Sequence, residues 1–127
     1  GKLGVVPGSM GSSGFIVRGK GNAESFNSCS HGAGRVMSRA AAFRTLKHAD
    51  MKKILKEQSI SLIGGTLDES PEVYKDINKV IDGQRDLVDV LAKFEPKLVR
   101  MAAEGNQWGN KKKKKKPENK GDGDVCM

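Results

Sequence analysis

The chain of 127 residues is long enough for one modest domain, and its formal net charge is +8. Hydrophobic residues make up 36% of the chain and aromatic residues 5%, which is little for a domain that must fold alone. This composition indicates either a dependent part of a larger protein or a partly disordered chain. No apolar run approaches the roughly 18 residues of a membrane span, so we expect a cytoplasmic protein with no membrane partner.

The first 34 residues are rich in Gly and Ser and contain two short apolar runs, at residues 3–6 and 15–17. This pattern predicts two strands joined and followed by tight loops. Because the chain begins at Gly1, directly before the first strand-like run, we expect a truncated start. The glycine clusters suit a close approach of backbone amides to a ligand, and they equally suit plain hairpin turns.

A helical alternation of apolar and basic residues follows Gly34, so a helix is expected to begin just after it. Asp50 is expected to cap a second short helix. The apolar run at residues 60–63, which a glycine pair ends, predicts a further strand.

A third helix is expected from Ser70, because proline and an acidic residue follow in its first turn. Its apolar stripe consists of Val73, Ile77, Val80 and Ile81. Residues 87–91 and 97–103 fit helix and strand alike, and their β-branched content favours strands.

From about residue 105 onward the sequence is polar, with six consecutive lysines at 111–116 and Trp108 as the single aromatic side chain. A disordered Lys-rich tail is therefore expected over residues 105–127. Residues 111–127 carry +4 of the net charge, which suits a polyanionic partner and equally suits a solvated tail. We expect residues 1–104 to form an α+β fold, with mixed strands and short helices.

The densest cluster of unusual residues surrounds His31, which lies among small residues just before the expected helix. A neutral imidazole is a competent nucleophile toward phosphorus, and helix amides with Arg35 and Arg39 suit phosphate oxygens. Two plainer interpretations stay open at this point. His31 could only hydrogen-bond a loop, or it could form half of a metal site with Cys29.

Other familiar signatures are not met. The Gly19-Lys20-Gly21 triplet lacks the context of a dinucleotide fingerprint, and no glycine loop is followed by a Walker lysine-serine pair. Cys29 and Cys126 are far apart, so we expect reduced thiols rather than a disulfide. Cys126 is also misplaced for prenylation, which needs cysteine at the fourth position from the end.

Several short motifs together resemble the RtcB family of RNA ligases in order and spacing. The most specific is His31-Gly32-Ala33-Gly34-Arg35 within residues 29–39, and the resemblance covers roughly residues 3–100. The other motifs are Pro7-Gly8-Ser9-Met10-Gly11, Val17-Arg18-Gly19, Glu24-Ser25-Phe26, Tyr74-Lys75-Asp76-Ile77 and Asp86-Leu87-Val88.

The resemblance implies an enzyme that joins RNA ends bearing a 2′,3′-cyclic phosphate or 3′-phosphate to a 5′-hydroxyl, in tRNA splicing and RNA repair. It implies GTP and manganese as cofactors, with His31 carrying a covalent guanylate that then passes to the RNA 3′-phosphate. Its RNA partners would be tRNA halves or broken RNA, and an archease-type activating protein is a further partner. The chain would form the C-terminal part of a larger catalytic domain.

The resemblance also implies a guanylate site, in which Tyr74 packs near the base and Arg35 and Arg39 serve the phosphates. The plainer interpretations are a turn at residues 7–10 and a core tyrosine at position 74. The other residues implied to line the site are Pro7, Gly8, Ser9, Met10, Gly32, Ala33 and Gly34.

Two positions depart from the family pattern. Gly14 stands where most members have a serine that contacts the base. Met101 stands at the ungapped equivalent of a guanine-reading lysine, with Arg100 one position earlier; on a strand, that offset reverses the facing of the side chain.

The metal ligands of the family lie upstream of the first motif, and His48 matches none of them, so no metal ligand is expected in this chain. We therefore expect this chain alone to be inactive. The alternatives are a basic RNA-binding module without chemistry and a degenerate relative.

Overall fold

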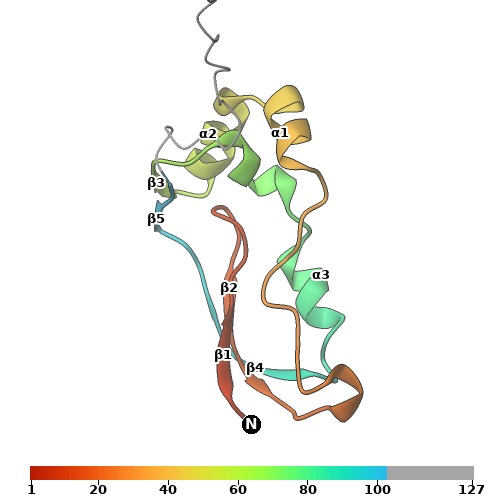
Figure 1. Cartoon of the computed structure of the whole chain (residues 1–127). Helices are drawn as coiled ribbons and strands as arrows, with labels where there is room; N and C mark the ends of the chain where they lie inside the picture. The colour runs from red at the N-terminus through yellow and green to blue at the C-terminus, as the bar shows by residue number, and fades with distance from the viewer. Residues whose placement is uncertain (103–127) are drawn as a thin grey trace, which may run out of the picture.

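The computed structural model describes residues 1–102 as an α+β fold, which confirms the expected fold class (Figure 1). The tail expected over residues 105–127, including Trp108 and the lysine run, lies outside the described residues. The strands are β1 (Leu3–Val6), β2 (Gly14–Gly19), β3 (Ser61–Ile63), β4 (Val88–Phe94) and β5 (Leu98–Arg100). The helices are α1 (Arg39–Thr45), α2 (His48–Glu57) and α3 (Ile77–Asp82), with 3-10 turns η1 (Ala23–Ser25), η2 (Leu67–Glu69) and η3 (Pro71–Val73).

The main sheet is antiparallel with strand order β1-β2-β4. β1 and β2 form the expected hairpin, in which Leu3 pairs with Arg18 and Val6 with Phe15. β2 pairs on its other side with β4, and the register shifts between Ile16 and Val17. The short apolar runs at the start of the chain are therefore strands, which confirms the prediction made from these runs and the glycine-rich loops around them.

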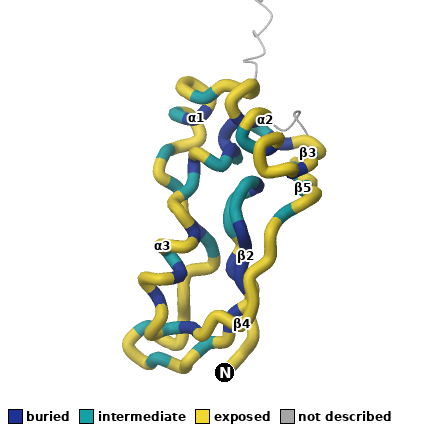
Figure 2. The backbone as a smooth tube through the Cα atoms, turned by 180° about the vertical axis from the view of Figure 1, so that it is seen from behind, coloured by how far each residue is buried: buried dark blue, intermediate teal, exposed yellow. Residues whose placement is uncertain are grey.

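One face of this sheet forms the first of two cores. Val6, Phe15 and Val17 pack there with Ile77 and Ile81 of α3. Since side chains alternate along a strand, the other face carries the neighbouring residues. Leu3 and Val5 on that face are 67% and 60% exposed. Figure 2 shows this contrast between the buried stretch of β2 and the exposed chain around it.

The second core lies where α2 meets the small sheet. β3 and β5 pair in parallel, with Leu62 beside Val99. Met10 from the tip of the β1–β2 hairpin packs here with Met51 and Leu55 of α2. The hairpin therefore joins both cores, and its tip reaches the α1–α2 end of the elongated molecule (Figure 1).

The helix expected directly after Gly34 begins later, at Arg39. Arg35 instead forms an isolated antiparallel bridge with Tyr74. The Val36 amide donates to the Val73 carbonyl at 2.8 Å. Ser38 then caps α1 by accepting from the Ala41 amide at 3.1 Å. The prediction was wrong because this tertiary pairing consumes the backbone groups that a first helical turn would use.

The single helix expected from Ser70 is also interrupted. Pro71–Val73 forms a 3-10 turn, Tyr74 is extended, and α3 begins only at Ile77 with Asp76 as its cap. The apolar stripe is nevertheless largely buried, because Val73, Ile77 and Ile81 all have exposures of 6% or less.

Asp50 is not the cap of the second helix. α2 begins at His48, with Lys47 in the N-cap position and no side-chain capping bond, and Asp50 lies in its first turn. An acidic side chain at that position still faces the positive end of the helix. The second short helix is therefore present, but the prediction that Asp50 caps it was wrong.

Candidate functional site

The hairpin tip between β1 and β2 is held in shape by its own serine hydroxyls. The Ser9 amide donates to Ser12 Oγ at 2.6 Å, and the two hydroxyl oxygens lie 2.8 Å apart. Gly8 is required there, because a Cβ on it would lie 2.3 Å from the Ser13 carbonyl oxygen. The tip is therefore a compact loop in which residue 8 must lack a side chain.

The His31 loop is fixed on both sides of the histidine. Before it, the Ser30 amide donates to the buried Gln84 side chain at 2.9 Å. After it, Ala33 is buried in the first core. His31 itself is exposed, and no hydrogen bond from another described residue holds its imidazole. The loop thus presents a free imidazole on an anchored backbone.

The hairpin tip and the His31 loop line one cavity of about 870 Å³. Gly32 lies against the hairpin, since a Cβ on it would be 3.5 Å from the Pro7 carbonyl oxygen. Tyr74 lines the same cavity while also packing against the first core, which fits the core-tyrosine interpretation, and its packing near a base stays a prediction. His31, Tyr74 and the other residues implied to line the guanylate site all border this cavity; those others are Pro7, Gly8, Ser9, Met10, Gly32, Ala33 and Gly34.

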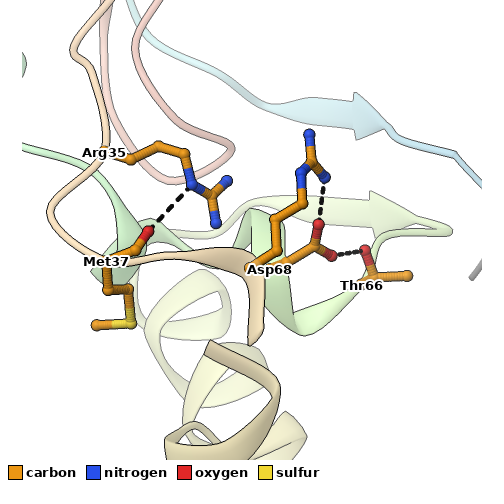
Figure 3. A network of polar contacts seen from close by, with 5 residues as sticks. Arg35, Met37, Thr66 and Asp68 are labelled. Atoms are coloured by element: carbon orange, nitrogen blue, oxygen red, sulfur yellow. Dashed lines mark hydrogen bonds and ion pairs between the residues drawn. The ribbon is translucent and has the colours of Figure 1, made fainter. Parts of the chain in front are cut away.

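Arg35 lines the cavity too and is partly immobilised. Its Nε donates to the Met37 carbonyl at 3.1 Å (Figure 3). Its guanidinium lies over the Tyr74 ring, 5.5 Å from the ring centroid. Its Nη2 is buried without a hydrogen-bond partner among the described residues. Leaving a buried donor without a partner costs free energy, so this nitrogen is suited to donate a hydrogen bond to an anionic oxygen of a ligand.

Arg39, expected to serve phosphates beside Arg35, has a different partner. Its guanidinium pairs with the buried carboxylate of Asp68, to which the Thr66 hydroxyl also donates (Figure 3). Arg39 is not among the residues that line the cavity. Its role toward RNA stays a prediction.

Burial raises the pKa of Asp68, but the Thr66 hydroxyl and the Arg39 guanidinium together lower it further, so the pKa lies below its ordinary value. A carboxyl with a depressed pKa stabilises the fold above its unfolded-state pKa, and this contribution is lost as the pH falls through the folded-state value. Asp68→Asn is therefore expected to lower stability by about 1–3 kcal/mol near neutral pH.

Below about pH 4 the difference between wild type and Asp68→Asn should shrink. Thermal unfolding of both proteins from pH 7 down to pH 3 measures it. Asp82→Asn is the matched control, because the Asp82–Arg85 pair is exposed on both sides and contributes little. A difference between wild type and Asp68→Asn that is the same at every pH would contradict the assignment.

Two acidic side chains near the cavity were missed. Glu69 Oε2 is buried without a partner among the described residues, and Glu95 accepts from Ser13 Oγ at 2.8 Å. The Ser13 hydroxyl lowers the pKa of Glu95, in spite of a smaller effect of burial in the other direction. Neither residue belongs to a recognisable local motif. Their places at the cavity depend on tertiary structure, which the local sequence does not reveal.

The remaining wall of the cavity comes from residues 94–101, at the end of β4 and along β5. Arg100 is exposed, whereas Met101 is partly buried against the second core. The two neighbouring side chains thus differ in exposure, as expected for adjacent positions of an extended chain. Both residues line the cavity. The sequence pattern alone had singled out only these two residues of the wall.

Residues 1–102 contain no group of three or more His, Cys, Asp or Glu side chains that could hold a metal ion. These residues do not fit the manganese ions that the family resemblance implies, and we derive no metal-dependent step from them. Cys29 is a free, exposed thiol, and Cys126 lies outside the described part of the chain. None of the helices in the same part is both long and apolar enough to span a membrane.

The comparison with protein families identifies the class of protein to which this hairpin, histidine loop and cavity belong. The model of the family "tRNA-splicing ligase RtcB" matches residues 1–102. The chain belongs to the RtcB family.

Individual relatives carry the same name. The chain is 48% identical over 91 residues to the RNA-splicing ligase RtcB of Escherichia coli (strain K12), which covers 72% of this chain and 22% of that protein. It is 35% identical over 103 residues to the tRNA-splicing ligase RtcB of Nanoarchaeum equitans, covering 75% and 22%. The chain thus spans less than a quarter of the length of these curated relatives.

Proposed function

We propose that this chain carries the guanylate-accepting histidine of a GTP-dependent ligase that joins RNA 2′,3′-cyclic phosphate or 3′-phosphate ends to 5′-hydroxyl ends. The single observation that carries the proposal is the shared cavity, in which an exposed, unengaged His31 lies with the Arg35 guanidinium and its unpartnered Nη2. A nucleophile and an anion-binding donor are the two groups that nucleotidyl transfer requires of a protein.

The proposed first step forms a bond between an imidazole nitrogen of His31 and the α-phosphorus of GTP. The bond between that phosphorus and the bridging oxygen breaks, and pyrophosphate leaves with the electron pair. Arg35 stabilises the charge that develops on the phosphate oxygens. Because His31 lies on a backbone held by Gln84 and by Ala33, little ordering is needed to reach the phosphorus.

In the second step an oxygen of the RNA 3′-phosphate attacks the same phosphorus, and the histidine leaves as neutral imidazole after protonation. This produces a mixed anhydride between the RNA and GMP. The RNA 5′-hydroxyl then attacks the 3′-phosphorus, GMP leaves, and a phosphodiester joins the two ends. The covalent histidine therefore converts a poor leaving group into a good one.

Partners and metals beyond residues 1–102 complete the proposal. We place the manganese ligands outside the described residues, and we take tRNA halves or broken RNA as substrates, in tRNA splicing or in RNA repair. An archease-type protein is proposed as the activating partner. The exposed, free thiol of Cys29 suits the reducing cytoplasm, where we place the activity.

The rival functions make different predictions. A basic RNA-binding module would bind RNA with steep salt dependence and would not need GTP. That hypothesis rests on residues 111–116, outside the described part, and on Arg35 with Arg39, of which Arg39 is paired with Asp68. A degenerate relative would lack manganese ligands in the rest of the protein.

Deleting residues 111–127 is expected to leave guanylylation unchanged and to weaken RNA binding at low salt. A lysine run contributes counterion release without fixing geometry, so the slope of log affinity against log salt should become shallower. RNA binding at several salt concentrations measures this, and a variant with the six lysines replaced by serine is the matched control for length. Loss of guanylylation in the deletion would show that the tail takes part in chemistry.

A further inference from the structure

Gly14 and Phe94 form a matched pair at the edge of the cavity. Gly14 begins β2 and pairs with Phe94, the last residue of β4. A Cβ on Gly14 would lie 2.2 Å from Cζ of the Phe94 ring, far inside the closest approach of real atoms. The ring therefore occupies the space that a side chain at position 14 would need, and the glycine makes room for it.

The backbone on both sides of this pair is fixed. Ser13, next to Gly14, is buried, and its hydroxyl donates to the carboxylate of Glu95, next to Phe94, at 2.8 Å. Glu95 also forms an ion pair with Lys93, in which Lys93 Nζ lies 3.4 Å from Glu95 Oε1. The ends of β2 and β4 are thus tied together by side chains as well as by the sheet. A ring held in this way is ordered before a ligand arrives.

Packing on Gly14 leaves part of the Phe94 side chain accessible. Phe94 remains 44% exposed while lining the same cavity as His31, and Leu98 beyond it is 66% exposed. Phe94 and Leu98 are apolar members of this part of the lining, beside the charged Glu95 and Lys97, whereas Ser9, His31 and Arg35 line the cavity elsewhere. A cavity with an apolar and a cationic part suits a ligand that has both a flat apolar group and an anionic group.

We propose that Phe94, seated on Gly14, stacks on the flat face of the nucleobase and so positions the nucleotide whose phosphates reach Arg35 and His31. This inference rests on the proposed function and adds a base-contacting residue to it. A ring face does not read the edge of a base, so Phe94 contributes affinity for any nucleobase and not discrimination between bases. Discrimination must come from polar groups elsewhere in the cavity.

The test compares Phe94→Ala, Phe94→Leu and Phe94→Tyr in the full-length protein that carries this chain. Equilibrium binding is measured with GTP, with ATP and with inorganic tripolyphosphate, which has no base. We expect Phe94→Ala and Phe94→Leu to lower the affinities for GTP and for ATP by the same factor, about 5- to 150-fold. The affinity for tripolyphosphate should be unchanged. Phe94→Tyr should bind nearly as wild type. GTP binding at wild-type strength in Phe94→Leu would overturn the proposal, because leucine keeps the packing and loses only the ring.

A second pair of variants tests the role of Gly14. Gly14→Ala should weaken GTP binding by displacing the ring, which can swing since Cζ is its far end. Added to Phe94→Ala, the same change should have little further effect. Independent, multiplying effects would show that the two residues do not act as a pair. Thermal unfolding of each variant separates these outcomes from loss of the fold.

The stacking role and the proposed chemistry fail separately. GTP binding that depends on Phe94 without covalent labelling of His31 would defeat the proposed ligase step and leave the base contact standing. Normal labelling of His31 with unchanged GTP binding in Phe94→Ala would defeat only the base contact.

Discussion

Substituting His31→Ala in the full-length protein is expected to reduce covalent labelling by GTP to background. The wild-type protein, incubated with α-labelled GTP and manganese, should acquire a guanylate that is labile in acid and stable in alkali, as a phosphoramidate is. The physical reason is that the described residues place one exposed imidazole in the cavity that also holds Arg35. Without that nitrogen no bond to the α-phosphorus can form.

His48→Ala is the matched control for this experiment. His48 is the other histidine of the chain and lies at the start of α2, in a separate groove along that helix. Its replacement should leave the label intact, so a difference between the two variants assigns the modified residue. Persistent acid-labile label in His31→Ala would remove the assigned role.

Residues 1–127 expressed alone are expected to take no label from GTP and to unfold over a broad temperature range. Ordering the backbone costs about 1–2 kcal/mol of conformational entropy per residue. The buried apolar side chains that offset this cost lie in two small cores. Leu3, Val5 and Ile16 lie on the exposed face of the main sheet, so their burial contributes little. Residues 1–102 also offer no ligand cluster for a divalent ion that would neutralise a triphosphate.

Calorimetry and GTP labelling of the isolated chain, beside the full-length protein under the same conditions, measure both parts of this expectation. A sharp, reversible transition together with label on His31 would show that residues 1–127 suffice. A sharp transition without label would separate the two parts, since folding would then be independent and the chemistry would not.

The strands were predictable because their signal is local. β1 and β2 are short β-branched runs between glycine-rich loops, and β4 and β5 contain the β-branched Val88, Val90 and Val99, which favour strand over helix. The helix boundaries failed for the opposite reason. Arg35 and Tyr74 lie far apart in sequence, and only their bridge explains why no helix begins at the first and why one is interrupted at the second.

The site divides in the same way. The hairpin tip, the His31 loop and Tyr74 were expected together from family motifs, and the structure brings them to one cavity. Glu69 and Phe94 carry no motif, and their place in the cavity depends on how β3, β4 and β5 are arranged around the hairpin. Sequence spacing placed Arg39 one helical turn from Arg35 and so beside the same phosphates. In the fold Arg39 is instead paired with Asp68.

The parallel pairing of β3 with β5 has a consequence for the order in which this cavity comes into being. Ser61 meets Leu98 across a long stretch of intervening chain, whereas the β1–β2 hairpin closes between near neighbours. Contacts between distant parts of a chain form later than local ones, because more chain entropy must be lost first. A growing polypeptide that has reached Tyr74 contains the residues of the hairpin and of the histidine loop, but Gln84, which holds that loop, and the wall at residues 94–101 are made later. The cavity is therefore complete only late in synthesis, and a chain that stops shortly before β5 would contain His31 but lack the part of the cavity wall that residues 98–101 provide.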